Sequence, residues 1–165
     1  MNSLYKISLI CTLLLFLVFT ACQAQSGDGI MTEYPKEQAE ILQTWDDIVE
    51  SVKMGDIDKL ISFHAYSPKF TEFKQGAPRN GAEDNEAFER GVFGSVKDVL
   101  RMDANDMKVA VYHGNVAVVT FHSDFHLRFE EETAVVNDQI SLVFVKNSDG
   151  DWKIVHEHHS PLAQS

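Results

Sequence analysis

Cysteine is almost missing from this 165-residue sequence, which contains only Cys11 and Cys22. An internal disulfide and thiol chemistry are therefore excluded for everything that follows Cys22. Basic residues are also scarce, with 14 Lys and Arg against 25 Asp and Glu and a net charge of −11. Because nucleic-acid binding needs a basic stripe that neutralises phosphates, no nucleic-acid partner is expected.

Long hydrophobic runs are limited to one, from Ile7 to Ala21, which follows the basic Lys6. A run of this length is too short to cross a membrane and suits the apolar part of a signal peptide. It ends in Val18-Phe19-Thr20-Ala21-Cys22, which resembles a bacterial lipobox. We therefore expect a signal peptide over residues 1–22, lipidation at Cys22 and a tether over residues 23–34. The expected location is the cell envelope, with membrane contact only through this lipid anchor.

An ordinary signal peptide remains the alternative. Phe19 departs from the lipobox, where leucine is usual, and Cys22-Gln23-Ala24 offers the small residues that a general signal peptidase needs. Cleavage there would release a periplasmic protein. Both routes lead to export.

The rest of the chain has the composition of one folded domain, expected over residues 35–162. Apolar residues make up 44% of the sequence, and it has no linker-like stretch and no internal repeat. Apolar residues at helical spacing predict a first helix that begins at Pro35 and ends at Gly55. Asp56 is expected to cap a short second helix, and a third is expected over residues 84–93. The apolar stripe of the first helix comprises Ile41, Leu42, Trp45, Ile48, Val49 and Val52.

Strands dominate the second half of the sequence. After a short strand at residues 70–73, we expect strands over 108–113, 116–129, 139–146 and 152–160, with turns at 113–115 and 147–151. Glu130 to Glu132 is interpreted as a loop or a strand end. Helices followed by a run of antiparallel strands predict an α+β fold with the helices packed on one face of the sheet.

Three short strings resemble one known family. They are Gly55-Asp56, the stretch from Pro68 to Phe73, and the stretch from Asp149 to Ser160, which reads DGDWKIVHEHHS. Together they resemble the nuclear transport factor 2-like (NTF2-like) superfamily, in its SnoaL-like and ketosteroid-isomerase-like branch. The closest likeness is to the association (hub) domain of calcium/calmodulin-dependent protein kinase and its stand-alone bacterial relatives, over roughly residues 38–161.

The resemblance implies a cone, in which a strongly bent antiparallel sheet wraps around the helices and leaves a deep pocket at the wide end. It also implies homodimers or larger rings formed through the outer face of the sheet. Members include isomerases and dehydratases as well as binding and assembly domains without activity, so the fold alone does not decide the function. The hub domain places arginines in its pocket at the positions of Ser123, Leu142 and a neighbour of His159. None is arginine here, so an arginine-held anion is not expected, and only a protonated His159 could supply similar charge.

The last predicted strand raises the question of what HEHHS at residues 156–160 does. Alternation puts Glu157 and His159 on one face, and His156 and His158 on the other with Trp152 and Ile154. The hub-like alignment turns Glu157 and His159 toward the pocket, whereas a β-bulge would change this assignment.

Glu157 and His159 could transfer protons in a cofactor-free isomerisation or dehydration, with His64 or Tyr66 assisting. The sequence favours the simpler interpretation, in which the two residues form a satisfied polar pair at the end of the sheet. A metal site is not expected, although His-x-His is a real ligand spacing. The strand expected at 139–146 should separate His122 and His126 from His156 and His158, which puts the two pairs too far apart for a shared ion. These four histidines are instead predicted to line a homodimer interface whose stability depends on pH.

A final group of side chains is expected to line an apolar pocket, although each would fit plain core packing as well. The group comprises Trp45, Phe63, Phe70, Phe73, Phe121, Ser123, Phe125 and Leu142. A cavity of this composition suits a small apolar ligand with a few polar contacts. The sequence therefore favours an exported, dimeric ligand-binding or assembly module. The alternative is a cofactor-free isomerase or lyase that uses a Glu/His pair.

Overall fold

The computed structural model describes residues 28–77 and 81–162, and the chain divides into the units Met1–Thr32 and Glu33–Ser165. In the first unit, the amides of Met31 and Thr32 donate to the carbonyl oxygen of Asp28 and close a turn. The predicted signal peptide and Cys22 lie outside the described residues. Among the helices that are described, none combines the length and hydrophobicity that a membrane crossing requires.

The first two helices of the second unit follow the sequence-based expectation. Helix α2, Pro35–Met54, has proline in its first turn and ends at Gly55, whose φ of 68° is left-handed. Helix α3, Ile57–Ser62, is capped by Asp56, whose carboxylate accepts a hydrogen bond of 3.0 Å from the amide of Lys59. Both caps were predicted because glycine adopts the left-handed region without strain and aspartate satisfies a free amide at a helix start.

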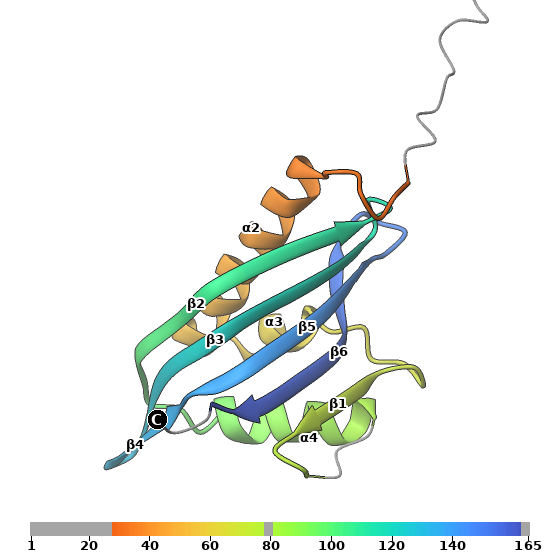
Figure 1. Ribbon diagram of the computed structural model, residues 1–165. Helices are drawn as coiled ribbons and strands as arrows, with labels where there is room; N and C mark the ends of the chain where they lie inside the picture. Colours follow the sequence, from red (N-terminus) through yellow and green to blue (C-terminus); the bar gives the residue numbers. More distant parts are fainter. Residues whose placement is uncertain (1–27, 78–80, 163–165) are drawn as a thin grey trace, which may run out of the picture. The chain divides into compact units, whose positions relative to one another are not determined.

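The sheet is mixed, not antiparallel as expected, and its strand order is β1-β6-β5-β3-β2 (Figure 1). Strand β1, Thr71–Lys74, pairs with β6 in parallel, and every other pairing is antiparallel. A parallel pair requires a long crossover connection, which the intervening chain supplies. The remaining strands are β2 Asp98–Tyr112, β3 Val116–Phe129, β4 Glu132–Val136, β5 Asp138–Lys146 and β6 Trp152–Pro161.

Two strands differ from the expectation because their side chains are largely exposed. Strand β2 begins ten residues before the predicted start at Lys108 (108 − 98). Strand β4 follows the expected turn at Glu130 and Glu131 and occupies residues for which no strand was predicted. Both have few buried positions, so the alternation that marks a half-buried strand is weak. Strand β3 matches its predicted bounds, and its inward set from Ala117 to Leu127 is buried as expected.

The curved, unclosed sheet is covered on one side by helices. Helix α2 packs against β2, while α4, Ala82–Phe93, lies beside α3 near the β1–β6 edge (Figure 1). Apolar residues of α2, including Ile41, Ile48 and Val52, meet Val119 and Phe144 of the sheet in one core. The core thus fills the space between the helices and the concave face, except where a cavity remains.

A β-bulge in β6 decides which side chains reach that cavity. His156 pairs with Val143 and Ile154 pairs with Phe144, so Val155 has no partner on β5. The extra residue shifts the alternation by one position. Ile154 before the bulge and Glu157 after it are therefore both buried. The expectation that His156 and His158 share a face with Trp152 and Ile154 is wrong for this reason.

Candidate functional site

A cavity of about 110 Å³ lies between the helices and the sheet. Its wall is mainly apolar and includes the aromatic rings of Trp45, Phe121 and Phe125, which contact one another. Five ionisable side chains interrupt the apolar wall, namely His64, Lys74, Glu89, Glu157 and His159. They come from four parts of the chain: the segment that follows α3, strand β1, helix α4 and strand β6.

Glu157 is the centre of the charged cluster. Its Oε1 lies 2.8 Å from Nε2 of His64, and its Oε2 lies 3.4 Å from Nε2 of His159. Burial would raise the pKa of Glu157, but the two imidazoles outweigh this effect and lower it below the usual range. Burial likewise opposes the charged form of His64, yet the bond to Glu157 and its charge raise the pKa of His64. Glu157 is thus ionised beside a histidine that favours its cationic form.

Glu89 on helix α4 behaves in the opposite way. Burial raises its pKa to about 8, and the negative charge of Glu157 adds to this rise. The positive charges of His64 and Lys74 reduce the rise only in part. At neutral pH Glu89 therefore retains its proton, while Glu157 in the same cavity has lost its own.

A second polar chain lies behind the cavity wall. The hydroxyl of Tyr66 donates to Oδ1 of Asn85 at 2.5 Å, and Nδ2 of Asn85 donates to Oε2 of Glu72 at 3.0 Å. Asn85 and Glu72 are completely buried, so these bonds fix helix α4 against β1. Because Glu89 is one helical turn beyond Asn85, the same bonds hold the Glu89 carboxyl in the cavity.

Glu72, Glu157 and His159 are the described side chains whose ligand atoms lie close enough together, within 4.8 Å, to suit a metal ion. Hydrogen bonds from Asn85 and His64 already occupy one oxygen of each carboxylate. These bonds hold the two carboxylates in place within the cluster.

Most of the predicted catalytic and pocket residues lie at this cavity. Of the predicted catalytic group, His64, Glu157 and His159 line it. Tyr66 is not in the wall, although its ring stacks on that of His64 with centroids 5.1 Å apart. Burial and the charge of Glu89 raise the pKa of Tyr66, so its hydroxyl stays protonated. Of the predicted pocket residues, Trp45, Phe121, Phe125 and Leu142 are in the wall.

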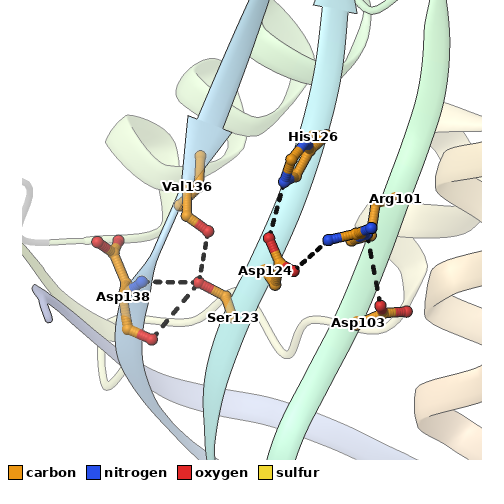
Figure 2. A network of polar contacts seen from close by, with 7 residues as sticks. All are labelled: Arg101, Asp103, Ser123, Asp124, His126, Val136 and Asp138. Atoms are coloured by element: carbon orange, nitrogen blue, oxygen red, sulfur yellow. Dashed lines mark hydrogen bonds and ion pairs between the residues drawn. The ribbon is translucent and has the colours of Figure 1, made fainter.

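Four predicted pocket residues lie elsewhere. Phe63 and Phe70 are buried in the core outside the cavity wall. Phe73 is 55% exposed, because it is in register with His158 on the outer face of the sheet. Ser123 is buried, but its hydroxyl donates to the carbonyl of Val136 at 2.9 Å and accepts from the amide of Asp138 at 2.8 Å (Figure 2). Its polar group therefore holds the β4–β5 corner and is not offered to a ligand.

The four histidines of the predicted interface lie on the outer face, where two of them contact carboxylates within the chain. His126 lies 2.8 Å from Asp124, which also accepts from Arg101 at 2.7 Å (Figure 2). His122 is 3.4 Å from Asp106. The remaining two, His156 and His158, have their rings 6.1 Å and 6.3 Å from the exposed ring of Phe73, measured between centroids.

Sequence reasoning missed Lys74, Asn85 and Glu89. In a short strand or a helix rich in acidic residues, such side chains suggest a solvated surface. One signal was present, because Asn85 and Glu89 share a face of the third helix with Phe88 and Val92. A polar pair on an apolar stripe indicates that a buried network exists, but it does not identify the partners.

Comparisons with known proteins agree with this architecture. The model of the SnoaL-like domain family matches residues 41–164. An NTF2-like protein from Streptomyces avermitilis has 18% identity and a TM-score of 0.68, covering 79% of this chain and 99% of its own. An NTF2-like superfamily protein from Salmonella enterica has 20% identity and a TM-score of 0.68, covering 79% and 94%.

A third solved structure extends the likeness to the hub-type domains. This protein from Xanthomonas campestris carries the provisional name of a calcium/calmodulin-dependent protein kinase II association domain. It has 19% identity and a TM-score of 0.62 over 81% of this chain and 91% of its own. No curated protein matched the sequence. At these identities the solved structures show the fold, and the family match covers most of the chain. The chain therefore belongs to the SnoaL-like domain family and has the NTF2-like fold.

Proposed function

We propose that the protein binds a small apolar molecule in the cavity and moves a proton on it without a cofactor, as an isomerase or a dehydratase does. The observation that carries this proposal is that two carboxyl groups in one cavity have opposite protonation states. Glu89 has a pKa of about 8 and is therefore protonated at neutral pH, whereas two histidines hold the pKa of Glu157 low. Carboxyl groups whose environments drive their pKa values apart are a common basis for acid and base roles.

His159 is the proposed general base. It lines the cavity, and within the described part of the chain neither of its ring nitrogens makes a hydrogen bond. Glu157, 3.4 Å from its Nε2, would orient the ring and stabilise the imidazolium that forms. Glu89 is the proposed general acid because it is the carboxyl in the wall that still holds a proton.

The two roles account for both reaction types with balanced protons. In a dehydration, His159 removes a proton from the carbon beside a carbonyl and the Glu89 proton joins the departing hydroxyl as water. Proton exchange with solvent then resets both residues. In an isomerisation, His159 returns the same proton to another carbon while Glu89 hydrogen-bonds to the carbonyl oxygen. The Streptomyces avermitilis protein carries the provisional name of a dehydratase, which supports dehydration as one of the two reactions.

Simple binding is the second candidate, and the largely apolar wall favours it. A panel of small β-hydroxy ketones and cyclic enones separates the two candidates. Binding is followed by calorimetry, and proton transfer by deuterium exchange and by the absorbance of a conjugated product. We expect turnover that is abolished in Glu89→Gln and His159→Gln. The matched control is His126→Gln, which changes the same residue type on the outer face and should leave turnover intact. Binding without exchange or turnover would leave only the binding function.

Export and lipid anchoring are proposed from the string that ends in Ala21-Cys22. Mass spectrometry of the membrane fraction tests this, because lipidation predicts a mature chain that starts at a diacylated Cys22. A start at Gln25 would replace the anchor with an ordinary signal peptide.

Homodimer formation through the outer face is proposed from the position of His122, His126, His156 and His158 on that face. Protonating histidines packed against a second copy would weaken the dimer as the pH falls. Sedimentation between about pH 5 and 8 tests this, and a monomer throughout that range would refute it.

A further inference from the structure

We infer that the molecule bound in the cavity carries an anionic head group, such as a carboxylate, and that Lys74 binds this group. The inference rests on the proposed function in one respect, since it requires that the cavity be occupied by a small molecule. It adds the chemical class of the ligand, an apolar body with one acidic group.

Lys74 has a position that differs from those of the other lysines. It is the last residue of the edge strand β1, is partly buried, and lines the cavity. Its Nζ lies 4.9 Å from the centre of the Phe88 ring. Within residues 28–77 and 81–162, Lys74 is the lysine that lines this cavity, and no carboxylate oxygen lies within 4.0 Å of its ammonium.

Five other described lysines are placed differently. Lys36, Lys97, Lys146 and Lys153 each lie within ion-pair distance of a carboxylate. Lys59 also sits over a ring, 5.0 Å from the centre of Phe63, but it does not line the cavity. A partly buried ammonium without an ion pair has lost hydration that no carboxylate replaces, and a ligand anion would replace it.

The carboxyl groups of the cavity leave the Lys74 charge available. Glu89 has a pKa of about 8 and is uncharged at neutral pH, and Glu157 is paired with His64 at 2.8 Å. Glu72 is turned toward Asn85, which donates to its Oε2. An anion beside Lys74 would therefore not face an ionised Glu89, and the mainly apolar wall would keep the interaction largely unscreened.

The same placement brings the ligand to the proposed base. Lys74 and His159 are partners in the parallel pairing of β1 with β6. Neighbouring strands lie about 4.8 Å apart, so a head group at Lys74 sets the adjacent ligand atoms beside His159. The apolar body would then extend along the rings of Phe121 and Phe125. Lys74 would thus fix which part of the ligand meets the proton-transfer groups.

Benzoate and benzamide test the inference, because they share a shape and differ in charge. Calorimetry at neutral pH compares both probes on the full chain, on Lys74→Met and on Lys74→Arg. The control is Lys59→Met, which removes the lysine that sits over a ring outside the cavity. We expect benzoate to bind about tenfold more tightly than benzamide, as charge-assisted hydrogen bonds imply. Lys74→Met should remove this preference, whereas Lys74→Arg and Lys59→Met should keep it.

A second measurement uses the unchanged protein and covers the case in which Lys74→Met does not fold. Raising the pH through about 8 ionises Glu89, so benzoate should lose affinity several-fold while benzamide does not. Equal binding of the two probes, or a preference that survives in Lys74→Met, would overturn the anionic class and leave the proposed function standing. If neither probe binds but the enones do, the anionic class also fails. If none of these molecules binds, both proposals fail.

Discussion

The two faces of the sheet carry similar groups in different surroundings. On the outer face, Asp124 lies between Arg101 at 2.7 Å and His126 at 2.8 Å (Figure 2). On the inner face, Glu157 lies between His64 at 2.8 Å and His159 at 3.4 Å. The outer carboxylate is partly exposed, with 25% of its side chain accessible, whereas the Glu157 side chain is 6% accessible.

The comparison shows that burial, more than the choice of partners, determines what such a cluster does. Water screens the outer cluster, so the bond from Arg101 lowers the pKa of Asp124 without constraining more distant groups. In the cavity, each charge acts on its neighbours with little screening. The ionised Glu157 therefore helps to raise the pKa of Glu89 to about 8. The predictions below test this difference between the faces.

The largest effect is expected from the proton on Glu89. Its pKa rises from 4.5 in the unfolded chain to about 8 in the fold, so the native state holds more protons between these values. The contribution of the Glu89 proton to the free energy of unfolding is therefore complete below pH 4.5, and it is lost as the pH rises through about 8. The full difference corresponds to about 5 kcal/mol.

Denaturant unfolding across this pH range checks the sign. Glu89→Gln mimics the protonated form and should flatten the fall in the free energy of unfolding. Glu83→Gln, an exposed change on the same helix, should follow the wild-type curve. Equal slopes for wild type and Glu89→Gln would contradict the buried, protonated state.

Two phenylalanines provide the next contrast between the faces. Phe121 is 4% exposed and packs against Trp45, whereas Phe73 is 55% exposed. Replacing Phe121 by alanine removes core contacts and should cost about 4 kcal/mol of unfolding free energy. Phe73→Ala should cost no more than about 0.5 kcal/mol in the isolated chain. A large loss for Phe73→Ala would show that its ring is covered, for example by a second copy.

Breaking the inner ion pair should cost more than breaking the outer one. Glu157→Gln leaves His64 buried without its charged partner, and we expect a loss of about 3 kcal/mol. Asp124→Asn removes the analogous carboxylate from the outer cluster and should produce a clearly smaller loss. Chemical unfolding at neutral pH and low salt measures both. If the two variants lose equal stability, burial is not what distinguishes the clusters.

The smallest effect concerns the corner between β4 and β5. Ser123→Ala leaves the amide of Asp138 without its 2.8 Å bond to the serine hydroxyl. An unsatisfied buried donor costs about 1.5 kcal/mol, whereas Ser148→Ala, in an exposed turn, should be neutral. Because the hydroxyl is bonded to backbone and not to a ligand, the affinity for the cavity probes should not change. If Ser123→Ala changes the binding free energy of the cavity probes by more than it changes the free energy of unfolding, Ser123 contacts the ligand after all.

The elements that the sequence predicted well share a local cause. Gly55 and Asp56 act through their own backbone neighbourhood, and β3 shows a clear alternation because one of its faces is buried. Strand β4 and the first half of β2 were missed because their exposed side chains give no such pattern. The partial resemblance to the hub domain directed attention to Glu157 and His159, but it offered no counterpart for Lys74 or Glu89.

By itself, the sequence determined the order of the helices and of the strands other than β4, the two helix caps and the inward face of the longest predicted strand. These features depend on residues that are near one another in the chain. Only the tertiary structure decided which polar side chains are buried together. The bulge at Val155 turns Glu157 and His159 inward, and the parallel pairing of β1 with β6 brings Lys74 beside them. The protonation of Glu89 follows from that arrangement, because a pKa responds to burial and to charges contributed by distant segments of the chain.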